Sequence, residues 1–198
     1  ITVKIASQTF VQNKSGKDDV ATEGGKEISE KLFDDVWYPI LFTFNDIIMN
    51  SKDMEVRSCC LHEMFEFLFN YGSFFSISIW NKICNKILFP IFSVLKTSSN
   101  ETVDKFNSHD DLSVWLNTTM IQALRNTIAL FTHYYDKLDK LIQQFLNILV
   151  SCICQENDTI ARIGRTCLQQ LILENVTRYD KAHWDLITKT FYQLFEST

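Results

Sequence analysis

Glycine and proline are both scarce in this chain of 198 residues, with five and two occurrences respectively. An all-β protein of this length needs many tight turns, and such turns depend heavily on these two residues. The shortage therefore argues against an all-β fold and favours helices. The chain is long enough for one globular domain or a short repeat array with a substantial core.

Basic residues are in the minority, since the formal net charge is -5 and the sequence pI is about 5.4. Broad binding to nucleic acid or to anionic lipid depends on clustered lysine and arginine, so we expect no nucleic-acid partner. No run approaches the roughly eighteen uninterrupted apolar residues of a membrane span. No charged-then-apolar leader opens the chain either.

The six cysteines contain no C-x-x-C pair. They lie mostly within apolar periodic segments, where a free thiol behaves as a small hydrophobic residue. We therefore expect no metal site, no disulfide framework and no cofactor, and we place the chain in the cytosol.

Serine, histidine and aspartate stand side by side in one stretch only, FNSHDD, from Phe106 to Asp111. A catalytic triad normally draws its residues from separate parts of the fold, because the three side chains must point toward one another. No G-x-S-x-G motif occurs, and a base would have to come from four histidines. An enzyme is therefore the third of our hypotheses. The histidines are His62, His109, His133 and His183.

Capping explains the same stretch better. Short polar side chains accept from unpaired N–H groups at helix N-termini, and carboxylates there favour the helix dipole. FNSHDD is therefore predicted to begin a helix. The polar set is nevertheless denser than a cap requires, so loop solubility and a partner or interdomain contact both stay open. That candidate contact comprises Asn107, Ser108, His109, Asp110 and Asp111.

Three segments divide the chain. Residues 1–11 read as the end of a preceding helix, and because they open within an apolar pattern we expect an excised fragment. Residues 12–27 are polar and glycine-bearing without periodicity, so a flexible loop is predicted. Residues 28–198 form the predicted helical domain.

Apolar residues recur at steps of three and four along this domain, as one face of a helix requires. The pattern predicts an all-α fold of about seven or eight helices packed as antiparallel pairs. Pro90 lies within one apolar stripe and is expected to kink that helix. Trp80, Trp115 and Trp184 lie on the stripes and are predicted to be largely buried.

A repeat underlies the helices, because D-x-x-x-R occurs at Asp53 to Arg57 and again at Asp158 to Arg162. Each copy is followed about twenty-two residues later by W-x-x-I, and the copies lie about a hundred residues apart. The spacing favours an armadillo- or HEAT-like α-solenoid over a four-helix or globin-like bundle. We expect each aspartate to cap its helix and each arginine to bond to an adjacent helix as a structural residue.

Three blocks together resemble the large guanine-nucleotide exchange factors that act on ADP-ribosylation factors (Arf) at the trans-Golgi. The match is with the helical region downstream of their catalytic exchange domain and looks most similar to the fungal member. The glutamate-bearing motif of the exchange domain cannot be found here. The blocks are VWYPILFTFNDIIM at 36–49, FNSHDDLSVWLNTTMIQALRNTIALFTHY at 106–134 and LVSCICQENDTIARIGRTCLQQLILENV at 149–176.

The resemblance implies a non-catalytic scaffold segment that controls autoinhibition, self-association or membrane recruitment. The implied partners are other domains of the parent chain, small GTPases of the Arf or Rab type, and a second copy of the parent. Its implied place is cytoplasmic, with peripheral attachment to trans-Golgi membrane through the parent. The alternative is a generic α-solenoid adaptor unrelated to exchange factors.

Replacing Asp110 and Asp111 together with asparagine separates a cap from a contact. Asparagine keeps the capping oxygens and removes both charges, so we expect a loss of less than about 1 kcal/mol in the free energy of unfolding. If the loop makes a contact, the same change alters exchange activity or membrane recruitment of the full-length factor. Unchanged activity and localisation would leave only the cap.

Overall fold

Helices make up the regular structure of this computed structural model, which describes residues 27–96 and 114–197. No strand occurs in these two ranges, and none of their helices is long and apolar enough to cross a membrane. The predicted all-α class is confirmed. The elements are α2 (Glu30–Leu32), η1 (Phe33–Trp37), α3 (Tyr38–Asn50), α4 (Met54–Tyr71), η2 (Gly72–Phe74), α5 (Ile77–Ile83), η3 (Cys84–Leu88), α6 (Phe89–Ile91), η4 (Phe92–Lys96), η5 (Leu116–Met120), α9 (Ile121–His133), α10 (Tyr135–Leu138), η6 (Asp139–Leu141), α11 (Ile142–Ile153), α12 (Asp158–Asn175) and α13 (Lys181–Ser197).

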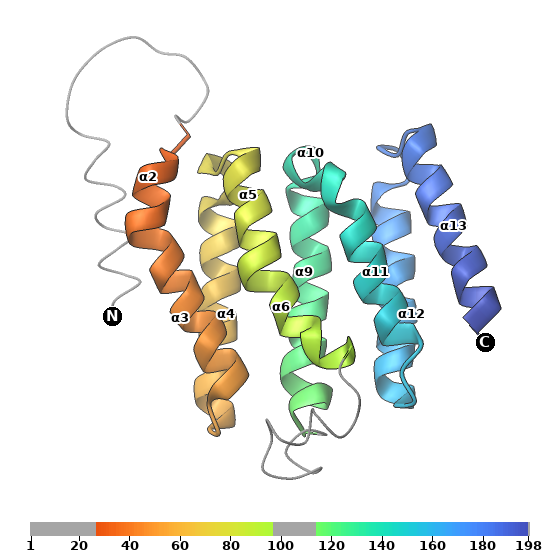
Figure 1. The fold of residues 1–198 in the computed structure, drawn as a ribbon, viewed down its shortest axis with the longest axis horizontal. Coiled ribbons are helices and arrows are strands. Elements are labelled where there is room, and N and C mark those ends of the chain that lie inside the picture. Colours follow the sequence, from red (N-terminus) through yellow and green to blue (C-terminus); the bar gives the residue numbers. More distant parts are fainter. Residues whose placement is uncertain (1–26, 97–113, 198) are drawn as a thin grey trace.

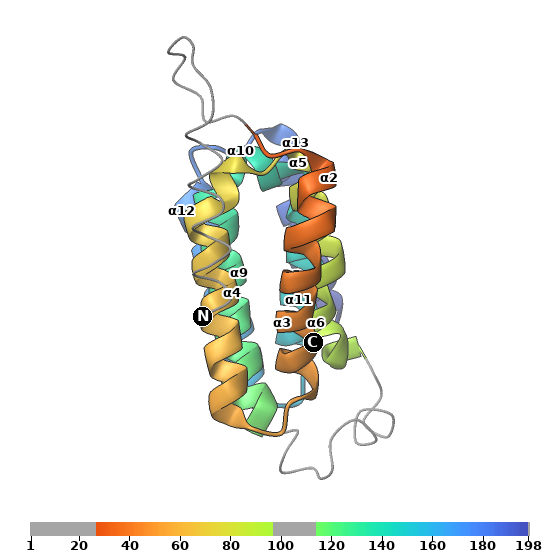
Figure 2. The same cartoon turned by 90° about the vertical axis from the view of Figure 1, so that its left-hand side faces the viewer.

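The helices stand in two rows (Figures 1 and 2). The first row holds α2–α3, α5–α6, α10–α11 and α13, and the second row holds α4, α9 and α12. Along the second row α4 contacts α9, and α9 contacts α12, while α3 pairs with α4 and α11 with α12 across the rows. The stack of antiparallel pairs is an α-solenoid, as the repeat predicted.

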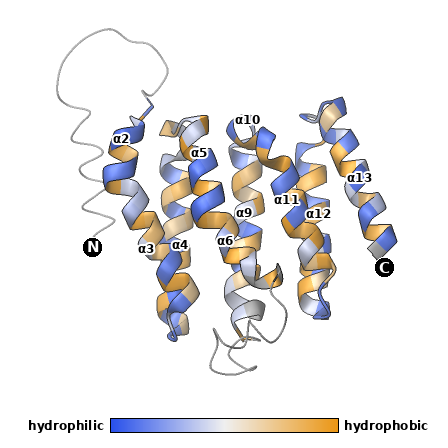
Figure 3. Cartoon of the chain, viewed as in Figure 1, coloured by the Kyte–Doolittle hydropathy of each residue, from blue (hydrophilic) through white to orange (hydrophobic). Residues whose placement is uncertain are grey.

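The core lies between the two rows. Trp80 and Trp115 are both 0% exposed, in agreement with their positions on the apolar stripes. The prediction for Trp184 is wrong, since this side chain is 38% exposed. Trp184 belongs to α13, the last helix of the first row, and no described helix covers its far side. Figure 3 shows hydrophobic residues along every helix, with α13 included.

Two helices of the first row contain a π-helical segment immediately before a proline. The N–H of Tyr38 bonds back to the carbonyl of Phe33 ahead of Pro39, and the N–H of Phe89 bonds back to Cys84 ahead of Pro90. Proline lacks an N–H and its ring crowds the carbonyl four residues earlier. The wider π turn relieves this crowding. The helix around Pro90 is therefore irregular at the position where the sequence predicted a kink.

The caps of the two D-x-x-x-R helices differ. Asp53 accepts from the N–H groups of Glu55 and Val56 and so caps α4. For α12 the expectation is wrong, because the cap is Asn157, which accepts from the N–H groups two and three residues further on. Asp158 is instead the first helical residue, where its carboxylate favours the positive end of the helix dipole.

Close packing of α11 on α12 depends on Gly164. A Cβ atom at this position would lie 2.8 Å from the Cβ of Cys152 and 3.1 Å from the backbone nitrogen of Ile153. Any larger residue would push the two helices of this pair apart.

Leu124→Ala tests the core. Leu124 is 1% exposed on the inner face of α9, so its truncation should lower the free energy of unfolding by about 2–5 kcal/mol. Chemical denaturation monitored by circular dichroism measures the change. Gln122→Ala, on the exposed face of the same helix, is the control and should cost less than about 0.5 kcal/mol. A Leu124→Ala variant that unfolds like the parent would refute the assignment of this face.

Candidate interaction surfaces

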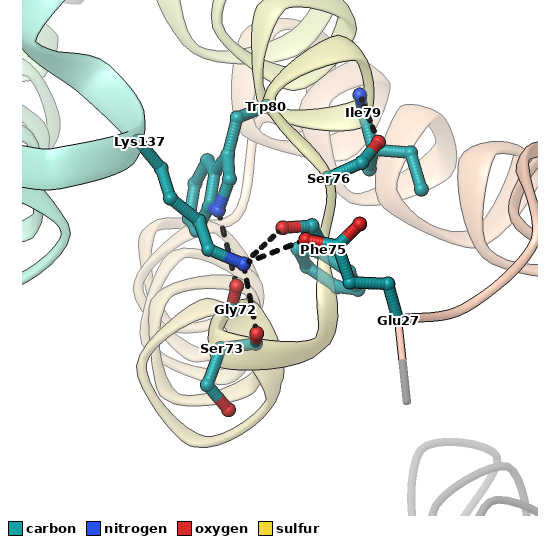
Figure 4. A network of polar contacts seen from close by, with 8 residues as sticks. All are labelled: Glu27, Gly72, Ser73, Phe75, Ser76, Ile79, Trp80 and Lys137. Carbon is teal, nitrogen blue, oxygen red and sulfur yellow. Dashed lines mark hydrogen bonds and ion pairs between the residues drawn. The ribbon is translucent and has the colours of Figure 1, made fainter. Parts of the chain in front are cut away.

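Lys137 connects the end of the first helix pair to the third. Its Nζ donates to the carbonyl oxygens of Ser73, at 2.8 Å, and Phe75, at 2.5 Å (Figure 4). These carbonyls lie in the turn after α4, where helix geometry leaves backbone acceptors without intrahelical partners. The Glu27 carboxylate lies 3.4 Å from the same nitrogen but is 55% exposed, so this ion pair adds little.

Two aromatic side chains complete the same contact. The indole N–H of Trp80 donates to the carbonyl of Gly72 at 3.1 Å, and the hydroxyl of Tyr134 donates to the carbonyl of Phe69 at 2.6 Å. Burial raises the pKa of Tyr134, so the phenol keeps its proton at neutral pH. We call Gly72 to Phe75, together with Trp80, Tyr134 and Lys137, the first joint.

Gly72 is required by this close approach. A Cβ atom there would lie 2.7 Å from the ring of Tyr134 and would also overlap the indole of Trp80. The two rings pack against each other with centroids 5.0 Å apart and their planes tilted by 40°. The first joint therefore depends on the absence of a side chain at this turn.

A second joint binds the turn after α12 to the end of α9. The guanidinium of Arg178 donates to the carbonyl of Thr132 at 3.1 Å, and the Tyr135 hydroxyl donates to the carbonyl of Arg178 at 3.1 Å. Asn175 donates to the Thr132 hydroxyl at 2.9 Å. Burial is the main cause of the raised pKa of Tyr135. Both joints lie along the same edge of the stack, at the upper ends of the helices in Figure 1.

The candidate contact at Asn107, Ser108, His109, Asp110 and Asp111 lies outside the described residues. Its role as a cap or as a contact stays a prediction. The first described helical residue after it is Val114.

Among the described residues, no hydrogen bond from either repeat arginine to an adjacent helix is found. Arg57 is 6% exposed, and its Nε is buried without a hydrogen-bond partner. Arg162 is exposed, and no bond from its guanidinium group to another described residue is found. An exposed pair of Arg162 with Asp158, one turn earlier, would gain little in water, which accounts for its absence.

Histidine contacts in the described part of the chain are those of surface and capping groups. His62 lies 3.6 Å from Glu66 on an exposed face. His183 lies 2.6 Å from Asp180, whose carboxylate also accepts from the His183 N–H; this backbone bond is the main cause of the lowered pKa of Asp180. His133 packs edge-on against Phe69. Within these residues no three side chains of metal-ligating type come together.

The cysteines are free thiols, and three of them are buried. Burial raises the pKa of Cys152 to about 12 and that of Cys167 to about 11. It also raises the pKa of Cys84. These thiols stay protonated at neutral pH and serve the core, as the sequence predicted.

A polar groove of about 630 Å³ lies between α4 and α9. Its polar lining includes His62, Gln122 and Arg125, which are all exposed. Water screens such groups, so a ligand would gain little from their charges.

An apolar groove of about 560 Å³ lies at the other end of the molecule, beside α12 and α13. Leu173 on α12 is 61% exposed and Phe191 on α13 is 41% exposed, although both are large hydrophobic residues. Burial of such side chains is worth about 25 cal/mol per Å². We call this the terminal groove; its lining is Ile153, Arg165, Leu168, Gln169, Ile172, Leu173, Phe191, Leu194 and Phe195.

Sequence reasoning missed both Lys137 and the terminal groove. No local pattern reveals the first, because its acceptors are 62 and 64 residues away. A signal for the second was present, since Phe191 and Tyr192 broaden the apolar stripe of the last helix beyond one face. That breadth indicates a helix with neighbours on more than one side.

Known proteins supply homologues for most of this chain. The ADP-ribosylation factor guanine nucleotide-exchange factor SEC7 of Saccharomyces cerevisiae is 60% identical over 167 residues, which are 84% of this chain and 8% of the yeast protein. The chain is homologous to a segment of the large Arf exchange factors. The match to sec71 of Schizosaccharomyces pombe is 35% identical over 170 residues, 86% of this chain and 9% of that protein.

The homology extends beyond fungi. The human brefeldin A-inhibited guanine nucleotide-exchange protein 1 is 29% identical over 163 residues, 82% of this chain. The chain spans less than a tenth of the length of these three exchange factors. No family model and no solved structure matches it. The resemblance drawn from the three sequence blocks is confirmed.

Lys137→Met tests the first joint. Methionine keeps the length of the aliphatic stem but leaves the carbonyls of Ser73 and Phe75 without their charged donor. We expect a loss of about 1 kcal/mol in the free energy of unfolding, the usual net contribution of a hydrogen bond, because the bond to Ser73 is exposed and the bond to Phe75 is only partly buried. Lys140→Met, an exposed lysine three residues further on, is the control and should stay within about 0.5 kcal/mol of the parent. Equal effects of the two substitutions would contradict the role of Lys137.

Proposed function

We propose that this chain is a non-catalytic regulatory scaffold segment of a large Arf guanine-nucleotide exchange factor that acts in Golgi vesicle traffic. One observation carries the proposal. The chain is 60% identical to a portion amounting to 8% of a protein named as an Arf exchange factor. The glutamate-bearing motif of the exchange domain is not found in this sequence, which supports a segment outside that domain.

The fold supports a scaffold role. Each helix pair packs on the next, and the two rows leave long faces of α4, α9 and α12 at the surface (Figure 2). Stacks of this kind commonly bind other proteins over a broad area. The exposed apolar residues of α12 and α13 offer a further contact surface.

The contacts that we propose control autoinhibition, self-association or membrane recruitment of the parent factor. The proposed partners are other domains of the parent chain, small GTPases of the Arf or Rab type, and a second copy of the parent. The parent would be cytoplasmic and peripheral on trans-Golgi membrane. The generic adaptor alternative has no comparable support, because the homologues bear the names of exchange factors.

The test is an exchange assay on liposomes with the full-length factor. Leu124→Asp places a charge in the core of the segment, and Asn147→Asp places one at an exposed position of α11, in the other row of helices, as the control. We expect Leu124→Asp to change the rate of Arf nucleotide exchange or the membrane-bound fraction by about fivefold or more, the lower range of coupling between sites. The control should match the parent.

The isolated exchange domain is assayed in parallel, and we expect it to exchange nucleotide without this segment. A full-length Leu124→Asp factor that exchanges nucleotide and binds membrane like the parent would contradict a regulatory role. Loss of catalysis by an exchange domain that lacks the segment would contradict a non-catalytic one.

A further inference from the structure

We propose that the terminal groove seats one amphipathic helix of the same polypeptide, antiparallel to α13, as the next helix of the second row. The inference rests on the proposed function, because it requires the longer chain of an exchange factor. It names an intramolecular contact of the segment.

The residues that line the terminal groove form a surface on which a helix can pack. Leu168 and Ile172 lie four residues apart on α12, and Leu173, next to Ile172, forms the exposed flank of the groove. Phe191 and Leu194 lie three residues apart on α13. Two such ridges with a furrow between them are the surface against which a third helix packs.

The order of the stack predicts which helix belongs there. After α3 the chain turns back through residues 51–53 into α4, and after α11 it turns back through residues 154–157 into α12. In each case the returning helix packs on its first-row partner, and α12 also packs on α9 of the second row. A helix returning from α13 would pack on α13 and α12 in the same way. The terminal groove lies at that place.

The two W-x-x-I tryptophans also indicate that a further helix packs beside α13. Trp80 in α5 is 0% exposed and packs against the ring of Tyr134, which lies at the start of the next first-row helix. Trp184 holds the corresponding place in α13 but is 38% exposed. A terminal helix that caps a solenoid requires a polar outer face. The outer face of α13 instead carries large hydrophobic residues, as an internal helix of the stack does.

The groove also specifies the chemistry of its occupant. The occupant needs apolar residues at steps of three and four to meet Leu173 and Phe191. An acidic residue on its flank would face Arg165, which is exposed and makes no ion pair with the described residues. The connections into α4 and α12 are short, at residues 51–53 and 154–157, whereas residues 97–113 separate the two rows in the second pair. The helix should therefore begin within about ten to twenty residues after α13.

Photo-crosslinking in the full-length factor tests the occupant. Benzoylphenylalanine at Leu173 should crosslink within the same polypeptide, to a segment in about the first forty residues after Thr198, which is room for a turn and a helix. Benzoylphenylalanine at Glu174, exposed in the same turn of α12 but outside the groove lining, is the control and should not reach that segment. The crosslinked peptides are identified by mass spectrometry.

Any other product overturns the proposal. A crosslink between two copies would make the groove a dimer interface, one to another protein would make it a partner site, and no crosslink would leave it open to water. Failure of the proposed regulatory function is recorded separately, because the exchange assay does not depend on which segment occupies the groove.

Hydrogen exchange provides a second measurement. In the full-length factor Leu173→Glu and Phe191→Glu should each accelerate amide exchange in α13 by about tenfold or more, because they remove apolar contacts that protect the helix. Lys189→Glu, exposed on α13 outside the groove lining, introduces the same side chain and should leave the exchange rates unchanged. Equal exchange rates in all three variants would contradict an occupied groove.

Discussion

The backbone carbonyls at the end of α4 are the constraint on which the stack depends. Helix geometry leaves the last carbonyls of α4 without intrahelical partners. The bond to the Gly72 carbonyl is buried and the bonds to Phe69 and Phe75 are partly buried, and an unpaired buried acceptor costs about 1–3 kcal/mol. Here the donors come from later helices, with Trp80 from the second pair and Lys137 from the third. The pairs are therefore joined by directional polar bonds as well as by apolar packing, and this fixes how each pair is set on the next.

The joints have a consequence for the role of the segment. Turns that are bonded to later helices restrict how one pair can move relative to the next. The second joint repeats the arrangement between α9 and the turn before α13. A segment restricted in this way can hold partners bound along its length at a fixed separation. This property suits the proposed scaffold of an exchange factor.

Apolar periodicity and the repeat were sufficient to predict the helices and their stack of antiparallel pairs, because both patterns can be read in the sequence itself. The family of the homologues was predicted from the resemblance of three sequence blocks. The sequence was not sufficient to predict the joints, since Lys137 and its acceptors are far apart in the chain. Trp184 has the same stripe position as Trp80 but lacks the neighbour that would bury it, so periodicity alone overestimated its burial. The cap of α12 is Asn157 and not Asp158, so the predicted and observed positions differ by one residue. Helix boundaries predicted from sequence commonly differ by this much.

Hydrogen exchange of the protein in increasing denaturant tests most directly whether the pairs form one unit. The amides of α4 and α12, in the first and third pairs, are the reporters. If the joints couple the pairs, the free energies of opening for the two helices converge on a single value as denaturant rises. Two values that stay apart would show that the pairs unfold independently, and the account of the joints would be wrong.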